Sequence, residues 1–138
     1  MPLLLVGLGL LALMGTVFWL QVQPPVVTVR SDGLEVESLF YGTSFAADDV
    51  AAVSLETRLP RVLARTNGFA AAGTLRGHFH VEGLGPGRLF VEAGNSPHVL
   101  VRLREGFVMV NLSEPETTRA LYDEMVGAWP DRVVTPSP

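Results

Sequence analysis

The sequence predicts a mainly β fold: a barrel or sandwich of about seven antiparallel strands with one C-terminal α-helix, preceded by an N-terminal transmembrane helix. Three observations predict it. Residues 61–112 alternate between apolar and polar side chains, and Gly-bearing turns interrupt them about every ten residues. Residues 115–128 repeat apolar side chains at helical spacing. Residues 2–20 contain no charged side chain.

The composition limits the size of the protein and its partners. The 138 residues carry a net charge of −4, contain no cysteine and use only arginine among the ten basic residues. Beyond the apolar N-terminus there is room for one domain of about 110 residues, which can form a core without metals or disulfides. The net charge provides no general attraction to nucleic acid, so we expect no nucleic-acid partner. No motif calls for a cofactor, and none is expected.

Residues 2–20 predict a membrane anchor. The segment is long enough to cross about 30 Å of hydrocarbon as a helix that rises about 1.5 Å per residue. Phe18 and Trp19 at its end suit the membrane interface, and a proline pair at 24–25 ends the helix. No basic residue precedes the segment and no small-x-small pattern follows Trp19, which favours an uncleaved anchor over a secretory signal peptide.

The anchor makes the cell membrane the predicted location, with one crossing and contact with the lipid bilayer through residues 2–20. Arg30 is the first charged side chain after the anchor, and positive charge favours the cytoplasmic side, so the folded domain is expected there. The chain is accordingly divided into an anchor at 1–23, a folded domain at 24–128 and a flexible tail at 129–138.

The first strands of the domain are predicted as a hairpin. Residues 26–30 are rich in β-branched side chains, residues 34–39 alternate, and the turn-forming residues 31–33 separate them. Leu34 and Val36 are expected on the buried face, and the glutamates between and after them on the solvent face. A short strand then leads into a turn at Asp48 and Asp49 and a further strand from residue 50.

The central strands are expected at residues 62–66, 75–81, 88–93, 99–103 and 107–112, joined by turns at 67–68, 85–87 and 105–106. Ser113 is expected as the N-cap of the last helix, because Pro115 and Glu116 follow it in a capping-box arrangement. The helix presents one apolar face, which we expect to pack on the strands.

A series of motifs in order resembles the bacterial pleckstrin-homology (PH) domain family. The motifs are Arg65-Thr66-Asn67-Gly68, Gly77-His78-Phe79, an apolar strand after Gly87, a Val-rich strand at 99–103, and Leu112-Ser113-Glu114-Pro115-Glu116 before the last helix. The resemblance covers roughly residues 48–126 and depends on the order of the motifs. It implies a PH-like barrel in a membrane protein, with no catalytic residues to assign. Where the family has a Pro-Gly-aromatic sequence this chain has Ala72-Gly73-Thr74, so that loop receives no role from the resemblance.

Arginines are concentrated in the central strands. Between Arg58 and Arg104 there are seven arginines and only two glutamates. Four of the arginines are expected at solvent-facing strand positions, where they would form one basic face: Arg76, Arg88, Arg102 and Arg104. Such a face would bind an anionic lipid headgroup, an acidic segment of a protein partner, or the acidic rim of the domain itself. Scattered surface ion pairs, each contributing little, are the alternative.

Other chemistry has weaker support. His78 and His80 project to one strand face and would bind zinc if His98 lay nearby, but no cysteine or close carboxylate completes the set, and no metal is expected. No serine has the glycine pattern of a nucleophile elbow, and the glycines at 83–87 lack the Lys-Ser/Thr of a phosphate loop. The sequence therefore favours a non-catalytic binding or assembly module with an unidentified protein partner. The alternative function is a sensor of an anionic headgroup or small anion.

Overall fold

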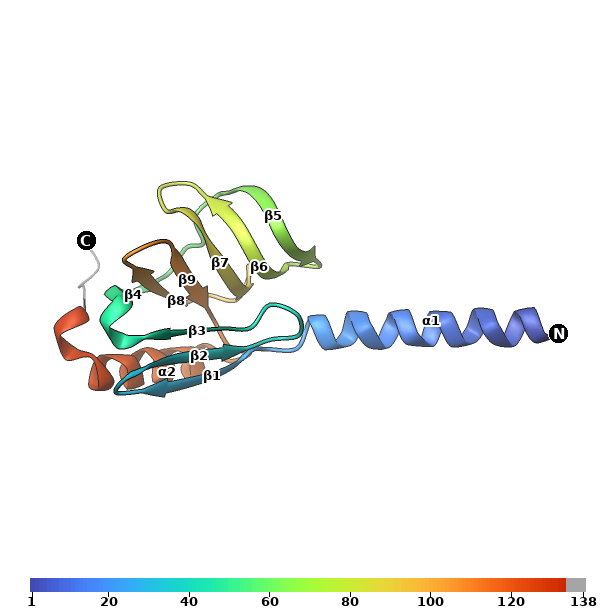
Figure 1. Ribbon diagram of the computed structural model, residues 1–138, viewed down its shortest axis with the longest axis horizontal. Helices are drawn as coiled ribbons and strands as arrows, with labels where there is room; N and C mark the ends of the chain where they lie inside the picture. Colours follow the sequence, from blue (N-terminus) through green and yellow to red (C-terminus); the bar gives the residue numbers. More distant parts are fainter. Residues whose placement is uncertain (134–138) are drawn as a thin grey trace.

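The computed structural model describes residues 1–133 and consists of one long helix that extends from a β-rich domain (Figure 1). The helix, α1 (Pro2–Gln21), is long and apolar enough to cross a membrane. In the described residues the domain has nine strands in two sheets and a C-terminal helix, α2 (Pro115–Ala128). The mainly β fold, the apolar N-terminal helix and the C-terminal helix are therefore confirmed, whereas the strands number nine rather than about seven.

The smaller sheet contains β1 (Val26–Arg30), β2 (Gly33–Glu37) and β3 (Thr43–Ala46) in antiparallel order. Arg30 pairs with Gly33, so the predicted hairpin forms with a two-residue connection. Residue 33 is a glycine because β3 approaches it closely: a Cβ atom at this position would lie 2.5 Å from the carbonyl oxygen of Phe45. Leu34 and Val36 are buried, as predicted.

The larger sheet has the strand order β4-β8-β9-β7-β6-β5. All neighbouring strands are antiparallel except β7 and β9, which pair in parallel. The expectation of a wholly antiparallel fold is wrong at this pair. β8 does not pair with β7, and β9 lies between these two strands, antiparallel to β8 and parallel to β7. The bounds are β4 (Val50–Glu56), β5 (Val62–Ala71), β6 (Thr74–Val81), β7 (Gly85–Glu92), β8 (His98–Leu103) and β9 (Phe107–Val110).

Two of the predicted turns lie inside strands. Asn67 and Gly68 belong to β5, where the pairing with β6 shifts register between Arg65 and Asn67. The actual β5–β6 turn is Ala72-Gly73, with φ angles of 52° and 81°. Residues 85–87 belong to β7, and the β6–β7 turn falls at 82–84. Asn67 and Gly68 thus occupy an irregular strand position rather than a chain reversal. Residues 85–87 instead begin β7 in regular pairing with β6.

Both faces of the larger sheet are covered. One face packs against the smaller sheet and α2, and Phe90, Val101 and Met125 are buried there. The other face encloses a second core as the sheet curls, with β5 and β6 standing above β8 and β9 in Figure 1. Leu100 is buried in this second core, although strand alternation predicts that it faces solvent.

The packed part of the chain continues beyond residue 128. The Trp129 side chain is buried and its indole Nε1 donates a hydrogen bond to the carbonyl of Arg30 at 3.0 Å. Val133 forms a parallel bridge with Val53. Residues 129–133 of the predicted tail are therefore part of the fold, and residues 134–138 lie outside the described part.

The start of α2 differs from the predicted capping box. Glu114, not Ser113, is the N-cap residue, and it makes no side-chain capping bond. Instead the hydroxyl of Thr118 accepts a hydrogen bond from the amide of Leu112 at 2.9 Å and donates one to the carbonyl of Glu114 at 3.3 Å. A side chain within the helix thus fixes the loop that enters it.

Candidate functional site

α1 joins the β domain at Arg76 of β6. The side chain is fully buried, which corrects the prediction that it faces solvent. Its guanidinium donates hydrogen bonds to the carbonyls of Gln23 at 3.1 Å, Leu75 at 3.0 Å and Val91 at 3.0 Å. It also forms an ion pair with Glu92 at 3.2 Å. One arginine therefore connects the segment that follows α1 with β6 and β7.

The strand register explains why Arg76 and Glu92 meet. Thr74 pairs with Glu92 and Arg76 with Phe90, so all four lie on one face of β6 and β7. The hydroxyl of Thr74 donates to the Glu92 carboxylate at 2.8 Å, which holds the acceptor in place. Burial lowers the pKa of Arg76 from its ordinary value, whereas the charge of Glu92 and its hydrogen bond raise it.

Aromatic and polar contacts complete the junction. Phe18 of α1 makes an edge-to-face contact with Phe69 of β5, with ring centroids 5.8 Å apart. The Gln21 side chain is also buried. Within residues 1–133, its Oε1 and the Arg76 Nε have no hydrogen-bond partner. A pocket of about 260 Å³ adjoins Arg76, lined by Val22, Pro24, Arg76, Glu92, Asn95, Asn111, Leu112 and Ser113.

Asn111 organises the loop behind this pocket. Its amide nitrogen donates to the carbonyls of Glu92 at 2.9 Å and Asn95 at 2.7 Å, and its oxygen accepts from the amide of Glu92 at 2.8 Å. Its amide nitrogen also lies 3.1 Å from Nδ1 of the buried His98. Burial lowers the pKa of His98, so the ring is held in its neutral form.

The histidines do not assemble a metal site. His98 is buried behind the junction, His80 is exposed and His78 is half-buried. Within the described part of the chain, no three or more His, Cys, Asp or Glu side chains are placed to hold a metal ion. The zinc hypothesis for these histidines therefore has no geometric support.

The four candidate arginines do not form one basic face. Arg88 pairs with Val108 of β9, whereas Arg102 pairs with Phe107 of the same strand. Because consecutive strand residues point to opposite faces, Arg88 and Arg102 lie on opposite faces of the sheet. Arg88 is half-buried and donates to the hydroxyl of Thr43 in β3. Arg104 is exposed, and its amide donates to the carbonyl of Asp49 at 2.9 Å. The prediction failed because alternation within each strand does not reveal the register between strands.

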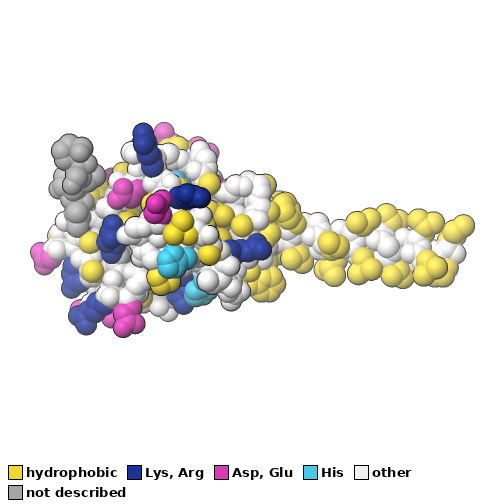
Figure 2. All heavy atoms as spheres, turned by 90° about the horizontal axis from the view of Figure 1, so that it is seen from above, with side chains coloured by type: hydrophobic (Ala, Val, Ile, Leu, Met, Phe, Trp, Pro, Cys, Tyr) yellow, Lys and Arg dark blue, Asp and Glu magenta, His cyan; other side chains and the backbone are white. Residues whose placement is uncertain are grey.

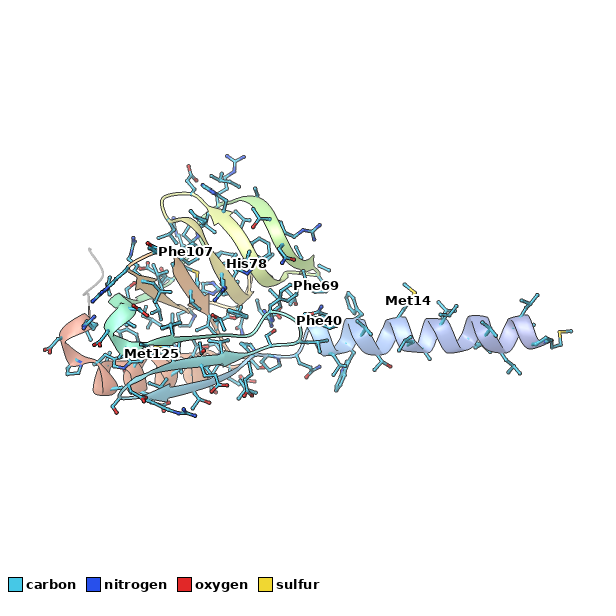
Figure 3. All side chains as sticks on the ribbon, in the orientation of Figure 1. Met14, Phe40, Phe69, His78, Phe107 and Met125 are labelled. Atoms are coloured by element: carbon cyan, nitrogen blue, oxygen red, sulfur yellow. The ribbon has the colours of Figure 1, made fainter. Side chains whose placement is uncertain are left out.

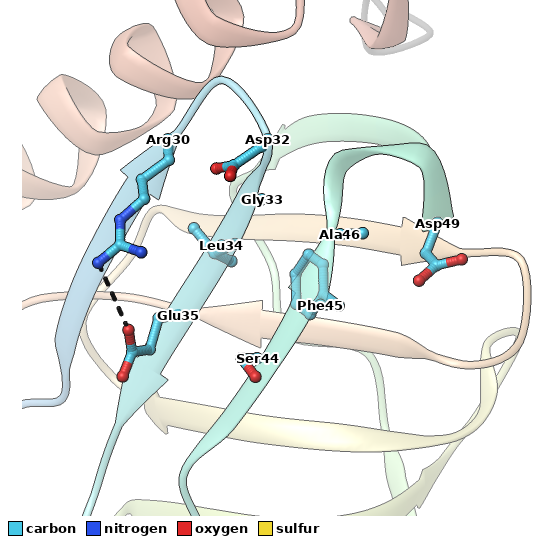
Figure 4. A pocket seen from close by; sticks show the side chains of 9 residues that line it. All are labelled: Arg30, Asp32, Gly33, Leu34, Glu35, Ser44, Phe45, Ala46 and Asp49. Carbon is cyan, nitrogen blue, oxygen red and sulfur yellow. Dashed lines mark ion pairs between the residues drawn. The ribbon is translucent and has the colours of Figure 1, made fainter.

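A larger pocket lies between the smaller sheet and the start of β4, at the end of the domain away from α1 (Figures 1 and 4). Arg30 and Glu35 form an exposed ion pair of 3.8 Å on its rim. The sequence did not single out this pocket, because it forms where β1–β3 meet the residues before β4. Its volume is about 600 Å³, and we name it the distal pocket: Arg30, Asp32, Gly33, Leu34, Glu35, Ser44, Phe45, Ala46 and Asp49.

The first motif of the PH resemblance, Arg65-Thr66-Asn67-Gly68, lies on the edge strand β5. Arg65, Thr66 and Asn67 are exposed and Gly68 is half-buried. The hydroxyl of Thr66 donates to the carbonyl of His78 at 3.3 Å across the β5–β6 pair. The motif thus shapes a strand irregularity and adjoins neither pocket. No family model, curated protein or solved structure matches the chain.

Proposed function

We propose that the protein is a single-pass membrane protein whose PH-like β domain is a non-catalytic binding or assembly module, held at the cytoplasmic face of the cell membrane by α1. The edge-to-face contact between Phe18 of α1 and Phe69 of β5 carries the proposal. Beside it, the buried guanidinium of Arg76 donates a hydrogen bond to the carbonyl of Gln23, in the segment directly after α1. A contact made by α1 itself favours an anchor that remains attached, because a signal peptide that is removed has no need to pack against the mature domain.

Two architectural features support the PH-like assignment. A small antiparallel sheet packs against a larger curled sheet, and a C-terminal helix covers the first core together with that small sheet. The parallel β7–β9 pair departs from an all-antiparallel PH-like barrel. The likeness we propose is therefore one of layers and helix position rather than of strand order.

The distal pocket is the surface that we assign to a partner. The anchor places it at the end of the domain that points away from the bilayer, where a protein segment can reach it (Figure 1). Asp32, Glu35 and Asp49 give it acidic character, and the half-buried Phe45 adds an apolar contact. This lining suits a basic or polar protein segment better than an anionic headgroup.

A pull-down of the full-length protein from detergent-solubilised membranes tests this assignment. The wild-type chain is expected to retain a partner that the Asp32→Asn/Asp49→Asn variant loses. The matched control is Asp123→Asn/Glu124→Gln, which neutralises two exposed carboxylates on α2 and should retain the partner. Equal retention by the pocket variant would contradict the assignment.

Vesicle flotation tests the alternative function. Residues 22–138, which lack α1 but keep Gln23 as the partner of Arg76, are mixed with anionic vesicles at low and high salt. Binding that salt abolishes would favour the headgroup sensor, because electrostatic attraction of exposed arginines is screened by salt. Arg102 and Arg104 are the exposed members of the predicted set and would be the residues to neutralise. Absence of salt-sensitive binding supports a protein partner.

A further inference from the structure

We propose that the domain also rests on the bilayer surface through an apolar rim around the end of α1, formed by Phe40, Phe69 and the alanines at 70–72. This inference rests on the proposed anchoring by α1. The occupant of the rim is the lipid interface itself, and the rim would fix the height and tilt of the domain in addition to the junction at Arg76.

Phe40 is the first observation. It lies in the β2–β3 loop with its side chain 73% exposed and a positive φ angle of 68°. A bulky residue in this backbone region is a genuine outlier and indicates that its position is imposed by the surroundings or by function. Figure 3 places Phe40 beside the domain end of α1. The protein itself leaves the Phe40 ring exposed, so the ring leaves water only if the bilayer covers it.

The β5–β6 hairpin is the second observation. Its tip projects toward α1 in Figure 1 and carries alanine at three consecutive positions, with no polar side chain before Gly73. Phe69, at the base of the tip, contacts Phe18 of α1. The hairpin and the β2–β3 loop thus reach the same end of α1 from two different sheets (Figure 3).

The length of α1 sets the depth of the rim. A helix of 20 residues is about 30 Å long, which equals the hydrocarbon thickness of a typical bilayer. The C-terminal turn with Phe18 therefore lies at the interface when α1 spans, and Phe69 lies at the same depth because it contacts Phe18. Aromatic side chains are the residues that favour this region.

The charge distribution agrees with this placement. In the view of Figure 2, hydrophobic side chains lie beside the root of α1 together with one basic side chain, and the acidic side chains lie farther along the domain. Arg76, which pairs with Phe69 across β5 and β6, is buried and paired with Glu92, so it places no free charge on the rim. The rim is thus continuous with the apolar surface of α1.

Site-directed spin labelling in nanodiscs tests the proposal, because the chain has no native cysteine. Full-length variants Phe40→Cys and Ala70→Cys report on the rim, Leu11→Cys on the middle of α1, and Glu105→Cys on an exposed turn of the β8–β9 hairpin. Labels at 40 and 70 are expected to collide more with oxygen and less with a water-soluble nickel complex than the label at 105. If the labels at 40 and 70 were as accessible to the nickel complex as the label at 105, while the label at 11 was buried in lipid, the proposed rim would be overturned and the anchor would stand. An aqueous label at position 11 would overturn the anchor as well.

A second variant set separates lipid contact from contact between two copies. Adding Phe40→Asp and Phe69→Asp to the Ala70→Cys chain should raise nickel accessibility at position 70 severalfold. Leu63→Asp, an exposed apolar position near the other end of β5, is the matched control and should leave it unchanged. Protection of position 70 only in discs that hold two copies would overturn the proposal in favour of a dimer contact, and protection in single-copy discs supports it.

Discussion

Arg76 is the residue on which the junction depends. Its burial costs desolvation energy, and the ion pair with Glu92 together with three carbonyl acceptors compensates that cost. Replacing such a pair by apolar side chains is often neutral, whereas removing one partner is strongly destabilising. The pair therefore serves to fix one arrangement of the segment after α1 on the domain, more than to add net stability.

Glu92→Ala is predicted to lower the free energy of unfolding by about 3 kcal/mol, the lower end of the range for breaking a buried pair, because Glu92 is partly exposed. The variant leaves the buried Arg76 charge without its counter-ion and the Thr74 hydroxyl without its acceptor. Urea unfolding of the full-length protein in mild detergent measures the change. Glu105→Ala, at an exposed turn, should stay within about 0.5 kcal/mol of wild type, and an equally small effect at Glu92 would contradict this account.

His98 makes the domain sensitive to acid. Its folded pKa is lowered by burial, so between that value and the ordinary pKa of 6.5 the unfolded chain binds more protons than the folded chain. Stability is therefore complete above the ordinary pKa and is lost as the pH falls toward the folded value. The loss proceeds by at most about 1.4 kcal/mol per pH unit.

We predict that His98→Gln reduces the pH dependence, since glutamine still offers an acceptor to Asn111 but does not titrate. Urea midpoints of wild type and variant, compared at about pH 7.5 and about pH 5.5, measure the effect. The wild type should lose more stability than the variant on acidification. Identical losses would show that other groups cause the dependence, and His80→Gln at an exposed position serves as the control.

At the scale of elements, the β5–β6 turn carries conformational strain. Ala72 and Gly73 both have positive φ, as a two-residue hairpin turn of the primed type requires. Glycine adopts this conformation freely, but alanine meets a steric cost between its Cβ and the following carbonyl. The hairpin forms in spite of this, because β5 and β6 pair along most of their length.

Ala72→Asn should therefore stabilise the protein by about 1 kcal/mol, since asparagine tolerates the left-handed region. Thermal unfolding in detergent gives the change. Asn67→Ala is the matched comparison: Asn67 lies exposed within β5, so its loss should cost less than about 0.5 kcal/mol. If Asn67→Ala strongly lowered the stability and Ala72→Asn did not raise it, the results would favour a turn at residues 67–68, where the sequence predicts it.

Local signals predicted the elements that depend on neighbours in sequence. The β1–β2 hairpin, the β8–β9 hairpin and α2 all follow from short-range alternation or helical spacing. The β7–β9 pair and the burial of Arg76 depend on segments far apart in the chain, which no local pattern encodes. The one sequence signal for the Arg76–Glu92 pair was that each residue is a charged side chain on a largely apolar strand and that the two charges are opposite. That signal became meaningful only once the register of β6 and β7 was fixed.

At the scale of the whole molecule, α1 and the domain form one elongated body (Figure 1). Phe69 contacts the last turns of α1 and Arg76 binds the segment directly after it, so together they restrict the movement of α1 relative to the domain. A flexible linker would let the domain sample all directions. In the proposed anchored state, the fixed junction instead presents the same face of the domain to the bilayer and the distal pocket to the aqueous side.

The last prediction concerns this rigidity. Spin labels at Leu11→Cys in α1 and Ser31→Cys at the β1–β2 turn should give one narrow distance distribution by pulsed electron resonance in nanodiscs. Inserting two glycines between Val22 and Gln23 should broaden it, because the added freedom lets α1 tilt away from Phe69 while Gln23 stays on Arg76. Two glycines inserted in the exposed β8–β9 turn after Glu105 leave the junction intact and should not broaden the distribution. A wild-type distribution as broad as that of the linker variant would mean that the domain swings freely on its anchor.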